Sequence, residues 1–438
     1  MSYLPHALMN PEVFSHAVED VQLVETHLSW VFLTGHHAYK VKKPVCFDFV
    51  DFSTLESREY FCSEEVRCNR KFAPKLYLGV VSIVLRGDGC FAVISGKPVH
   101  GDKIIDYAVH MLQFDSTLQA DLLLENDQLS AAQMHDFGVT LAVQHLALPE
   151  LSAPYDPGEA VRDNFTTLRA LGCLKSIKAQ LDYLEVSANS QFAAFEAFLQ
   201  KRRSEHFVRE CHGDLHLSNM VCLDSSLTAF DCLEFDEALR NIDVWCDVAF
   251  LFMDCCVRER ADLAYAFVDG YLVTSGDYSG LRLLPMFAAY RSVVRAKVAA
   301  LRFEQTTERE NWGKLQKYLS WPQMQNARMP GRLIINCGMS GSGKSYWASQ
   351  LVAALPSLRL CSDVLRKSLY GYTPLATSQS SVGKDLYSEG ASEQVYVKLV
   401  EYSTGLLALG ENVIVDAACL KKSQRTLFYE AAKRAGAA

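Results

Sequence analysis

Apolar and polar positions alternate in short runs along the first hundred residues, and this pattern predicts a small antiparallel sheet. The runs cover residues 30–33, 38–42, 78–84 and 91–94, and Gly/Asp turns such as residues 86–89 separate them. Between the second and third runs, residues 57–72 predict a helix with acidic residues in its early turns. We therefore expect a small lobe in which one helix accompanies a short sheet.

From residue 130 onward the apolar spacing changes to a helical period. Residues 130–148, 189–203 and 281–303 predict helices, and residues 219–223 and 227–231 predict a hairpin between them. Two prolines and a glycine bracket a polar stretch at residues 321–331, which marks a domain boundary. The predicted division is a small lobe at 1–112, a helical lobe at 113–329 and a further domain at 330–438, with a linker near 109–114 between the lobes.

Composition and charge limit the possible partners. Among the 438 residues, 49% are hydrophobic, yet no apolar run approaches the roughly 18 residues of a membrane-spanning helix. The 14 cysteines are scattered without a C-x-x-C spacing, and the N-terminus lacks a signal-peptide pattern, so we expect a cytoplasmic protein without a membrane partner. Residues 1–330 hold 31 basic and 43 acidic residues, whereas 331–438 hold 12 and 8. Nucleic acid is therefore an unexpected partner for the first part and a possible one for the second.

An acidic motif in the helical lobe has the spacing of a kinase catalytic loop. In such loops four residues separate the aspartate that receives the substrate hydroxyl proton from an asparagine that holds magnesium. Asp214 and Asn219 have this separation, and Asp231 follows at the end of the predicted hairpin. We therefore predict Asp214 as the general base and Asn219 and Asp231 as Mg²⁺ ligands.

These residues also carry a family resemblance that extends over nearly the whole chain. Residues 212–219 resemble the catalytic loop of aminoglycoside phosphotransferases and of their choline- and homoserine-kinase relatives. Residues 25–35 and 39–44 look like those of bacterial aminoglycoside phosphotransferase-like proteins that are fused to an AAA-type ATPase. The resemblance implies an α+β bilobal fold of the protein-kinase type, followed by an α/β P-loop NTPase domain.

The resemblance also implies roles in the small lobe. Lys40 would neutralise the α/β-phosphates of ATP, and Glu65 in the following helix would pair with it. Lys42 lies on the same strand face and Glu64 is adjacent to Glu65, so both remain alternatives. The sheet lacks a G-x-G-x-x-G loop, and the turn at residues 26–29 would have to cover the phosphates.

A second phosphate-binding motif begins the last domain. Residues 333–337 predict a buried strand, and the following residues fill every fixed position of G-x-x-x-x-G-K-[ST]. The loop residues expected to bind nucleotide are Gly338, Ser340, Gly341, Ser342, Gly343, Lys344 and Ser345. Lys344 should reach the β/γ-phosphates and Ser345 should hold Mg²⁺, with a helix over 344–355 presenting its N-terminus to phosphate.

Further residues of this domain complete the predicted site. Residues 413–416 predict a second strand that ends in Asp416, the expected position of the Walker B acid. Asp416 is therefore the second predicted Mg²⁺ ligand of the site. Residues 362–367 resemble the acceptor side of polynucleotide-kinase and zeta-toxin-like P-loop kinases, which implies Asp363 as acceptor base and Arg366 as substrate clamp. The alternative for residues 362–363 is a simple helix cap.

P-loop kinases of this type continue beyond the second strand with two more strands and an arginine-bearing lid. After Asp416 the sequence predicts one helix, at about 422–434, so we expect an incomplete, C-terminally truncated P-loop domain that binds phosphate but transfers little.

The sequence thus favours a phosphotransferase that uses ATP and Mg²⁺ to phosphorylate an unidentified small-molecule hydroxyl, fused to a domain that binds ATP or GTP. One alternative makes the kinase-like domain a non-catalytic sensor or scaffold. Another makes the P-loop domain the principal kinase, acting on a polynucleotide or sugar nucleotide under the control of the first domain.

Overall fold

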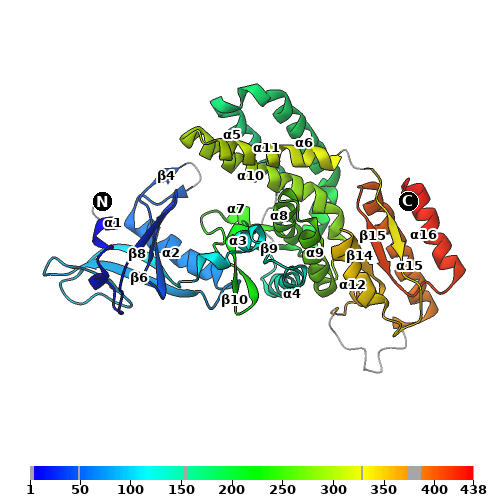
Figure 1. Ribbon diagram of the computed structural model, residues 1–438, viewed down its shortest axis with the longest axis horizontal. Coiled ribbons are helices and arrows are strands. Elements are labelled where there is room, and N and C mark those ends of the chain that lie inside the picture. The colour runs from blue at the N-terminus through cyan, green and yellow to red at the C-terminus, as the bar shows by residue number, and fades with distance from the viewer. Residues whose placement is uncertain are drawn as a thin grey trace. The chain divides into compact units, whose positions relative to one another are not determined.

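The computed structural model of the protein, shown in Figure 1, describes residues 4–47, 50–151, 156–326, 329–372, 374 and 386–437. The chain forms two compact units. One comprises Met1–Glu125 and His212–Arg240, and the other comprises Asn126–Cys211 and Asn241–Ala438. The segment that carries Asp214 therefore groups with the N-terminal sheet, and the P-loop elements group with the helices. Among the described helices, none is long and apolar enough to cross a membrane.

The first unit is built on a six-stranded antiparallel sheet in the order β1-β2-β3-β8-β6-β7. These strands span Gln22–Glu25 (β1), Ser29–Leu33 (β2), His37–Lys42 (β3), Tyr77–Leu85 (β6), Phe91–Ile94 (β7) and Lys103–Leu112 (β8). A short pair, β4 (Cys46–Phe47) and β5 (Val50–Asp51), precedes helix α2 (Leu55–Asn69), which Thr54 caps by accepting a hydrogen bond from the Ser57 amide. The antiparallel sheet and its helix are thus as predicted.

Strand β8 was not predicted as a strand, although it lies between β3 and β6. The prediction of a linker at residues 109–114 is wrong for its first part, because Val109–Leu112 are sheet residues and Val109 pairs with Lys40. Its middle residues, 106–109, are buried on both faces, since the sheet is covered on both sides. Only residues 113 and 114 follow the strand.

The two faces of this sheet have different covers, which sets the direction of the lysines on β3. The N-terminal segment, with α1 (Leu4–Ala7) and η1 (Pro11–Val13), packs on the face that carries Tyr39 and Val41. Helix α2 packs on the opposite face through Cys62 and Val66. Because side chains alternate along a strand, Lys40 and Lys42 point to the α2 face.

The remaining elements of the first unit carry the predicted catalytic loop. They are η2 (Ser116–Leu118), α3 (Ala120–Glu125), η4 (Leu217–Asn219), the hairpin β10 (Met220–Leu223) and β11 (Ser226–Ala229), and α7 (Glu237–Arg240). An isolated bridge between Gln119 and Val221 joins the segment after the sheet to the hairpin. The predicted hairpin is therefore present, and its second strand begins one residue earlier and ends two residues earlier than predicted.

The second unit begins with a helical part. Its elements are α4 (Ala131–Ala147), α5 (Pro157–Ala170), η3 (Gly172–Ile177), α6 (Lys178–Ser204), β9 (Val208–Glu210), β12 (Asn241–Asp243), α8 (Val244–Val257), α9 (Ala261–Ser275), η5 (Gly280–Leu283), α10 (Leu284–Thr306) and α11 (Arg309–Asn326). Helices α4 and α9 touch backbone to backbone, because a Cβ at Gly138 would lie 2.1 Å from the Phe267 carbonyl oxygen and one at Gly270 would lie 1.9 Å from that of His135. Any side chain at these glycines would force the two helices apart.

The second unit also contains a parallel sheet in the order β13-β15-β14. Its elements are β13 (Leu333–Ile335), α12 (Lys344–Ala354), β14 (Leu358–Cys361), α13 (Ser362–Leu369), α15 (Glu389–Ala408), β15 (Val413–Asp416) and α16 (Lys422–Arg434). Helices α12 and α16 lie on opposite sides of this sheet (Figure 1). Strand β15 is fully buried at the centre, whereas β13 is half-buried at the edge of the described sheet, which corrects the expectation of a buried strand there.

Candidate functional site

The two lysines of β3 converge on one buried glutamate. Lys40 Nζ donates to Glu65 Oε1 over 2.8 Å and to Asp231 Oδ1 over 2.5 Å. Lys42 Nζ donates to Glu65 Oε2 over 2.8 Å and forms a second ion pair with Glu234. The Lys42 side chain is 1% exposed and that of Lys40 is 15% exposed. Lys40 is thus the lysine that reaches both the glutamate and the predicted metal ligand.

Glu64, the rival of Glu65, turns to a different partner. Its carboxylate pairs with Arg67 over 2.7 Å, one turn further along α2, and lies 3.4 Å from Arg240. Glu65 has no exposed side-chain surface and bridges both lysines. In the geometry of this unit, Glu65 is therefore the partner of the lysines.

The charges in this cluster support one another. Burial raises the pKa of Glu65, but the adjacent Lys40 and Lys42 charges outweigh it and lower the pKa to about 2. Burial lowers the pKa of Lys40, and the carboxylates of Asp231, Glu65 and Glu234 outweigh that effect, so its pKa is raised. Both lysines and Glu65 are therefore charged at neutral pH.

The predicted catalytic loop is held by hydrogen bonds that fix its aspartate. Asn219 Nδ2 donates to the Asp214 carboxylate over 2.9 Å and to the Asp214 carbonyl over 3.0 Å. His212 Nε2 donates to the Phe230 carbonyl over 2.9 Å, and its Nδ1 accepts from the Asp214 amide over 3.4 Å. Since the carbonyl accepts and the amide donates, these two bonds define the tautomer of His212. The histidine orients the loop.

Gly213 is required by the backbone of this loop. Its φ of +81° lies in the left-handed region, and a Cβ would come within 3.0 Å of the Leu239 carbonyl oxygen. His216 adds a side-chain contact, with Nε2 3.4 Å from Asp214 Oδ2.

The hairpin returns Asp231 to the loop. The Phe230 amide donates to the Asn219 carbonyl over 2.9 Å, so Asp231 follows directly after a residue that is paired with Asn219. The Asp231 amide donates to the Tyr77 hydroxyl over 3.1 Å, and its φ is +60°. The first unit thus places Lys40, Asp214, Asn219 and Asp231 along one connected set of contacts.

The oxygen atoms in this set fit a magnesium ion, which prefers carboxylate and carbonyl ligands. Asn219 uses Nδ2 to hold Asp214, which leaves its Oδ1 as a possible ligand. The Asp231 side chain is 44% exposed, and its Oδ1 accepts a hydrogen bond from Lys40. Together the two residues offer an amide oxygen and an accessible carboxylate.

Sequence reasoning missed three residues that support this centre. Glu234 pairs with Lys42, Tyr77 receives the Asp231 amide, and Asn69 Oδ1 accepts from the Cys232 amide over 2.9 Å. Asn69 also donates to the Glu65 carbonyl over 2.9 Å, so it ties α2 to the loop after the hairpin. The acidic spacing from Asp231 to Glu234 was the one sequence signal that could have identified a member of this group.

The turn at residues 26–29 connects β1 and β2. The Thr26 amide donates to the Ser29 carbonyl over 2.9 Å, and the Thr26 hydroxyl accepts from the Ser29 amide over 2.9 Å. Lys43 Nζ lies at this turn, where it donates to the Thr26 carbonyl over 2.5 Å and to Glu25 over 2.6 Å. The predicted cover of the phosphates is therefore a closed turn that has a lysine beside it.

The P-loop site lies in the second unit, between the end of β13 and the first turn of α12. Gly341 and Gly343 each have a φ of +82°, which a glycine adopts without strain. The Gly338 amide donates to the Ala418 carbonyl over 3.0 Å, which fixes the start of the loop beside the end of β15. Lys344 Nζ donates to the Met339 carbonyl over 2.6 Å and thus folds back over the loop. The remaining predicted loop residues, Ser340, Ser342 and Ser345, belong to the same turn and helix start.

Asp416 ends β15 next to this loop. Its side chain is 2% exposed, and Oδ2 is buried without a hydrogen-bond partner. An unsatisfied buried carboxylate oxygen is costly, and a divalent cation would satisfy it. Asp416 Oδ2 and the Ser345 hydroxyl are therefore the two groups of this site that fit as ligands of a Mg²⁺ ion.

Asp363 and Arg366 lie on α13, which follows β14. Asp363 is half-exposed; its Oδ1 accepts from the Tyr387 hydroxyl over 3.0 Å, and Oδ2 lies 3.1 Å from Lys367 Nζ. Arg366 is buried, and its Nη1 donates to the Leu386 carbonyl over 2.8 Å. The aspartate is open to an acceptor, whereas the nitrogen of the predicted clamp already has a structural partner.

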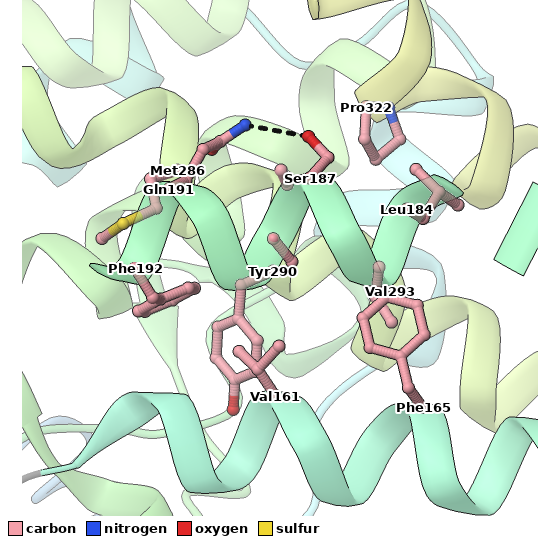
Figure 2. A pocket seen from close by; sticks show the side chains of 12 residues that line it. Val161, Phe165, Leu184, Ser187, Gln191, Phe192, Met286, Tyr290, Val293 and Pro322 are labelled. Carbon is pink, nitrogen blue, oxygen red and sulfur yellow. Dashed lines mark hydrogen bonds between the residues drawn. The ribbon is translucent and has the colours of Figure 1, made fainter. Parts of the chain in front are cut away.

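Two other features of the second unit resemble sites but have structural explanations. His145, Cys211 and Asp247 are buried within reach of one ion, but His145 already contacts Tyr271 over 3.1 Å and Asp247 over 3.2 Å with its two nitrogens. An apolar cavity of about 20 Å³ lies between α5, α6 and α10 (Figure 2), which is room for about one water molecule and not for a substrate. Its walls include Val161, Phe165, Leu184, Phe192, Met286, Tyr290, Val293 and Pro322, with Gln191 donating to Ser187 at one side.

Comparison with known proteins gives a family for each part of the chain. Residues 115–284 match the phosphotransferase enzyme family, and residues 333–438 match an AAA domain. An uncharacterized protein of Mycobacterium tuberculosis is 28% identical over 424 residues, which cover 92% of this chain and 80% of that protein. An uncharacterized protein of Mycobacterium bovis matches to the same extent.

Solved structures of small-molecule kinases are also similar. The GDP complex of aminoglycoside 2'-phosphotransferase-IIIa has a TM-score of 0.46 at 13% identity, over 73% of this chain and 99% of that one. A choline/ethanolamine kinase family protein from Mesorhizobium loti has a TM-score of 0.45 at 10% identity, over 74% and 93%. The two family matches cover the two parts of the chain that carry the motifs. The chain thus carries a kinase-like phosphotransferase domain, matched at residues 115–284, followed by a P-loop domain of the AAA type, matched at residues 333–438.

Proposed function

We propose that the kinase-like domain is an ATP- and Mg²⁺-dependent phosphotransferase that acts on the hydroxyl group of a small molecule. The observation that carries this proposal is the connected contact set in the first unit, in which Lys40 joins Glu65 to Asp231 while Asn219 holds Asp214. A structural ion-pair network would not need the half-exposed carboxylates of Asp214 and Asp231 at its open end.

Each residue has a separate task in the proposed reaction. Bound Mg-ATP supplies the phosphoryl group and part of the charge neutralisation. Asp214, oriented by Asn219 and His212, accepts the proton of the acceptor hydroxyl. Asn219 and Asp231 offer oxygen ligands to the metal, and Lys40, oriented by Glu65, neutralises phosphate charge. For Asp231 to bind metal, Lys40 has to give up one of its two carboxylate partners, and its bond to Glu65 keeps it in place.

The test is transfer of labelled phosphate from ATP into a pool of small hydroxyl metabolites by the full chain. Asp214→Ala should reduce the transfer by roughly 10²–10⁴-fold, the usual effect of losing a general base. Asp224→Asn is the matched control, because Asp224 is an exposed turn residue of the same unit, with φ +48°, that asparagine tolerates. Transfer that is equal in wild type and Asp214→Ala would overturn the proposal.

For the P-loop domain we propose binding of ATP or GTP at residues 338–345, with Ser345 and Asp416 as Mg²⁺ ligands. A second candidate function, phosphorylation of a polynucleotide or sugar nucleotide by this domain, is favoured by one observation. Asp363 is half-exposed and lies two residues after Cys361, which pairs with Asp416 in the sheet, so an acceptor-side carboxylate stands near the predicted metal ligand. If the second function is correct, Asp363→Asn abolishes transfer while Asp214→Ala leaves it intact.

A further inference from the structure

Helix α9 of the kinase-like part meets the P-loop sheet through one buried ion pair. Arg359, in strand β14, is 7% exposed. Its Nε donates to Asp269 Oδ1 over 2.8 Å, and its Nη2 donates to Asp269 Oδ2 over 2.9 Å. Two parallel bonds to one carboxylate fix the plane of the guanidinium as well as its position. Arg359 is thus oriented by a residue of α9.

The third nitrogen of the same guanidinium points toward the predicted magnesium ligands. Arg359 Nη1 donates to the Ser345 carbonyl over 3.3 Å and lies 3.6 Å from Asp416 Oδ2. Ser345 lies in the first turn of α12, and Asp416 ends β15. The Arg359 side chain therefore contacts α12 and the end of β15 at the P-loop, and its ion pair with α9 determines its orientation.

The Asp416 oxygen near Arg359 is the one that is buried without a hydrogen bond. At 3.6 Å the arginine gives this carboxylate a charge partner but not a bond, so the oxygen stays available. A cation bound to Asp416 would add positive charge beside Nη1 and change the balance between Asp416 and Asp269 for the arginine. Metal binding at the P-loop and the ion pair to α9 are therefore electrostatically linked.

The backbone of α9 can pass such a change to the rest of the helical part. Helices α4 and α9 touch at Gly138 and Gly270, and the latter is adjacent to Asp269. His135 of α4 also lies 3.6 Å from the Asp269 carboxylate. Because the two backbones touch beside Asp269, a displacement of α9 at this point would also displace α4.

We propose that Arg359 is a positioning residue for the P-loop magnesium site, and that Asp269 links occupancy of that site to helices α9 and α4 of the kinase-like domain. This inference rests on the proposed nucleotide binding by the P-loop. It makes the contact between α9 and the P-loop sheet a regulatory one, in which a nucleotide at the P-loop alters the packing of α9 and α4.

Hydrogen exchange on the full chain tests the link with Mg-ADP as the probe. The measurement uses the Asp231→Ala background, so that binding at the kinase-like site does not contribute. Mg-ADP should slow exchange in peptides of the P-loop and also in peptides of α9 and α4. Adding Lys344→Ala should remove all of these changes. Adding Asp269→Asn should keep the protection at the P-loop and remove it from α9.

Calorimetry supplies a readout that loss of packing alone would not change. Asp269→Asn should weaken ADP binding at the P-loop roughly fivefold or more in the presence of Mg²⁺, and leave it unchanged without Mg²⁺. Asp262→Asn is the matched control, because Asp262 lies on the same helix and pairs with Arg260 at the surface.

The outcomes separate the two proposals. P-loop protection with unchanged α9 exchange in the Asp231→Ala protein overturns the link and leaves nucleotide binding intact. An equal effect of Asp269→Asn with and without Mg²⁺ also overturns the link. Absence of any protection that depends on Lys344 overturns the proposed P-loop binding and the link with it.

Discussion

Replacing Glu65 with glutamine should destabilise the first unit by about 3–5 kcal/mol. The carboxylate is fully buried and accepts hydrogen bonds from both Lys40 and Lys42. Glutamine has a similar shape but no charge and only one acceptor oxygen. Removing one partner of a buried ion pair costs about 3–5 kcal/mol, and here two lysines would each lose one of their two carboxylate partners and keep only Asp231 or Glu234.

The pH dependence of this effect follows from the pKa of Glu65. Burial raises it, but Lys40 and Lys42 lower it from the ordinary 4.5 to about 2. At about 1.36 kcal/mol per unit, this lowering is worth about 3 kcal/mol of stability above pH 4.5, in agreement with the first figure. Because the folded pKa is the lower one, the contribution is lost as pH falls from 4.5 toward 2. The cost of Glu65→Gln should therefore be about 1 kcal/mol smaller at pH 3.5 than at pH 7.

Native-state hydrogen exchange measures this cost locally, which matters because a chain of several domains does not unfold in one step. Peptides of β3 and α2 report the opening free energy of the first unit. Glu25→Gln is the matched control, since Glu25 is 62% exposed and pairs with Lys43, so its loss should have little effect on stability. Equal costs for the two variants, or a cost for Glu65→Gln that does not change with pH, would refute the reasoning.

Asp231→Ala is expected to remove Mg-dependent nucleotide binding from the kinase-like domain, whereas Asp214→Ala should keep binding and slow transfer; equal losses of ATP affinity in calorimetry contradict this division. Lys344→Ala should reduce two calorimetric binding events to one, and an unchanged number means that the P-loop holds no nucleotide. Burial, with a smaller effect of His37 and His16, lowers the pKa of His110 from 6.5 to about 4. As the pH falls, His110 is therefore protonated in the unfolded chain before it is protonated in the folded one, and this favours unfolding. The stability of the first unit should rise from pH 4 to about 6.5, and His110→Gln should flatten this rise in the exchange of β8; an unchanged slope would assign it to other groups.

The sequence predicted those elements of the fold whose own residue pattern identifies them. Alternating residues identified β3 and the strands around it, and the glycine-rich loop predicted the turn before Lys344. Strand β8 was missed because both of its faces are buried, so its sequence does not alternate. Among the predicted helices, α6 begins at Lys178 and not at residue 189, and its added first part buries Leu181 and Leu184.

The candidate sites divide in the same way. Spacing within one motif predicted Asp214, Asn219 and Asp231, which lie close along the chain. Glu234 pairs with a lysine 192 positions away, and Asp269 with an arginine 90 positions away. No local pattern determines such pairs, because they depend on which surfaces meet in the folded chain.

The presence of two lysines on one face of β3 has an electrostatic reason. Lys42 is fully buried and has two carboxylate partners, Glu65 and Glu234, so moving it would leave buried charge uncompensated. Lys40 shares Glu65 but has an accessible second partner, Asp231, whose other proposed role is to bind metal. Lys42 thus fixes Glu65, and Glu65 in turn holds Lys40. The bond between Lys40 and Asp231 is the one that can break when Asp231 binds metal. We therefore expect Lys42→Met to alter nucleotide binding only through Glu65, and a Glu65→Gln protein to show no additional loss of affinity when Lys42→Met is added.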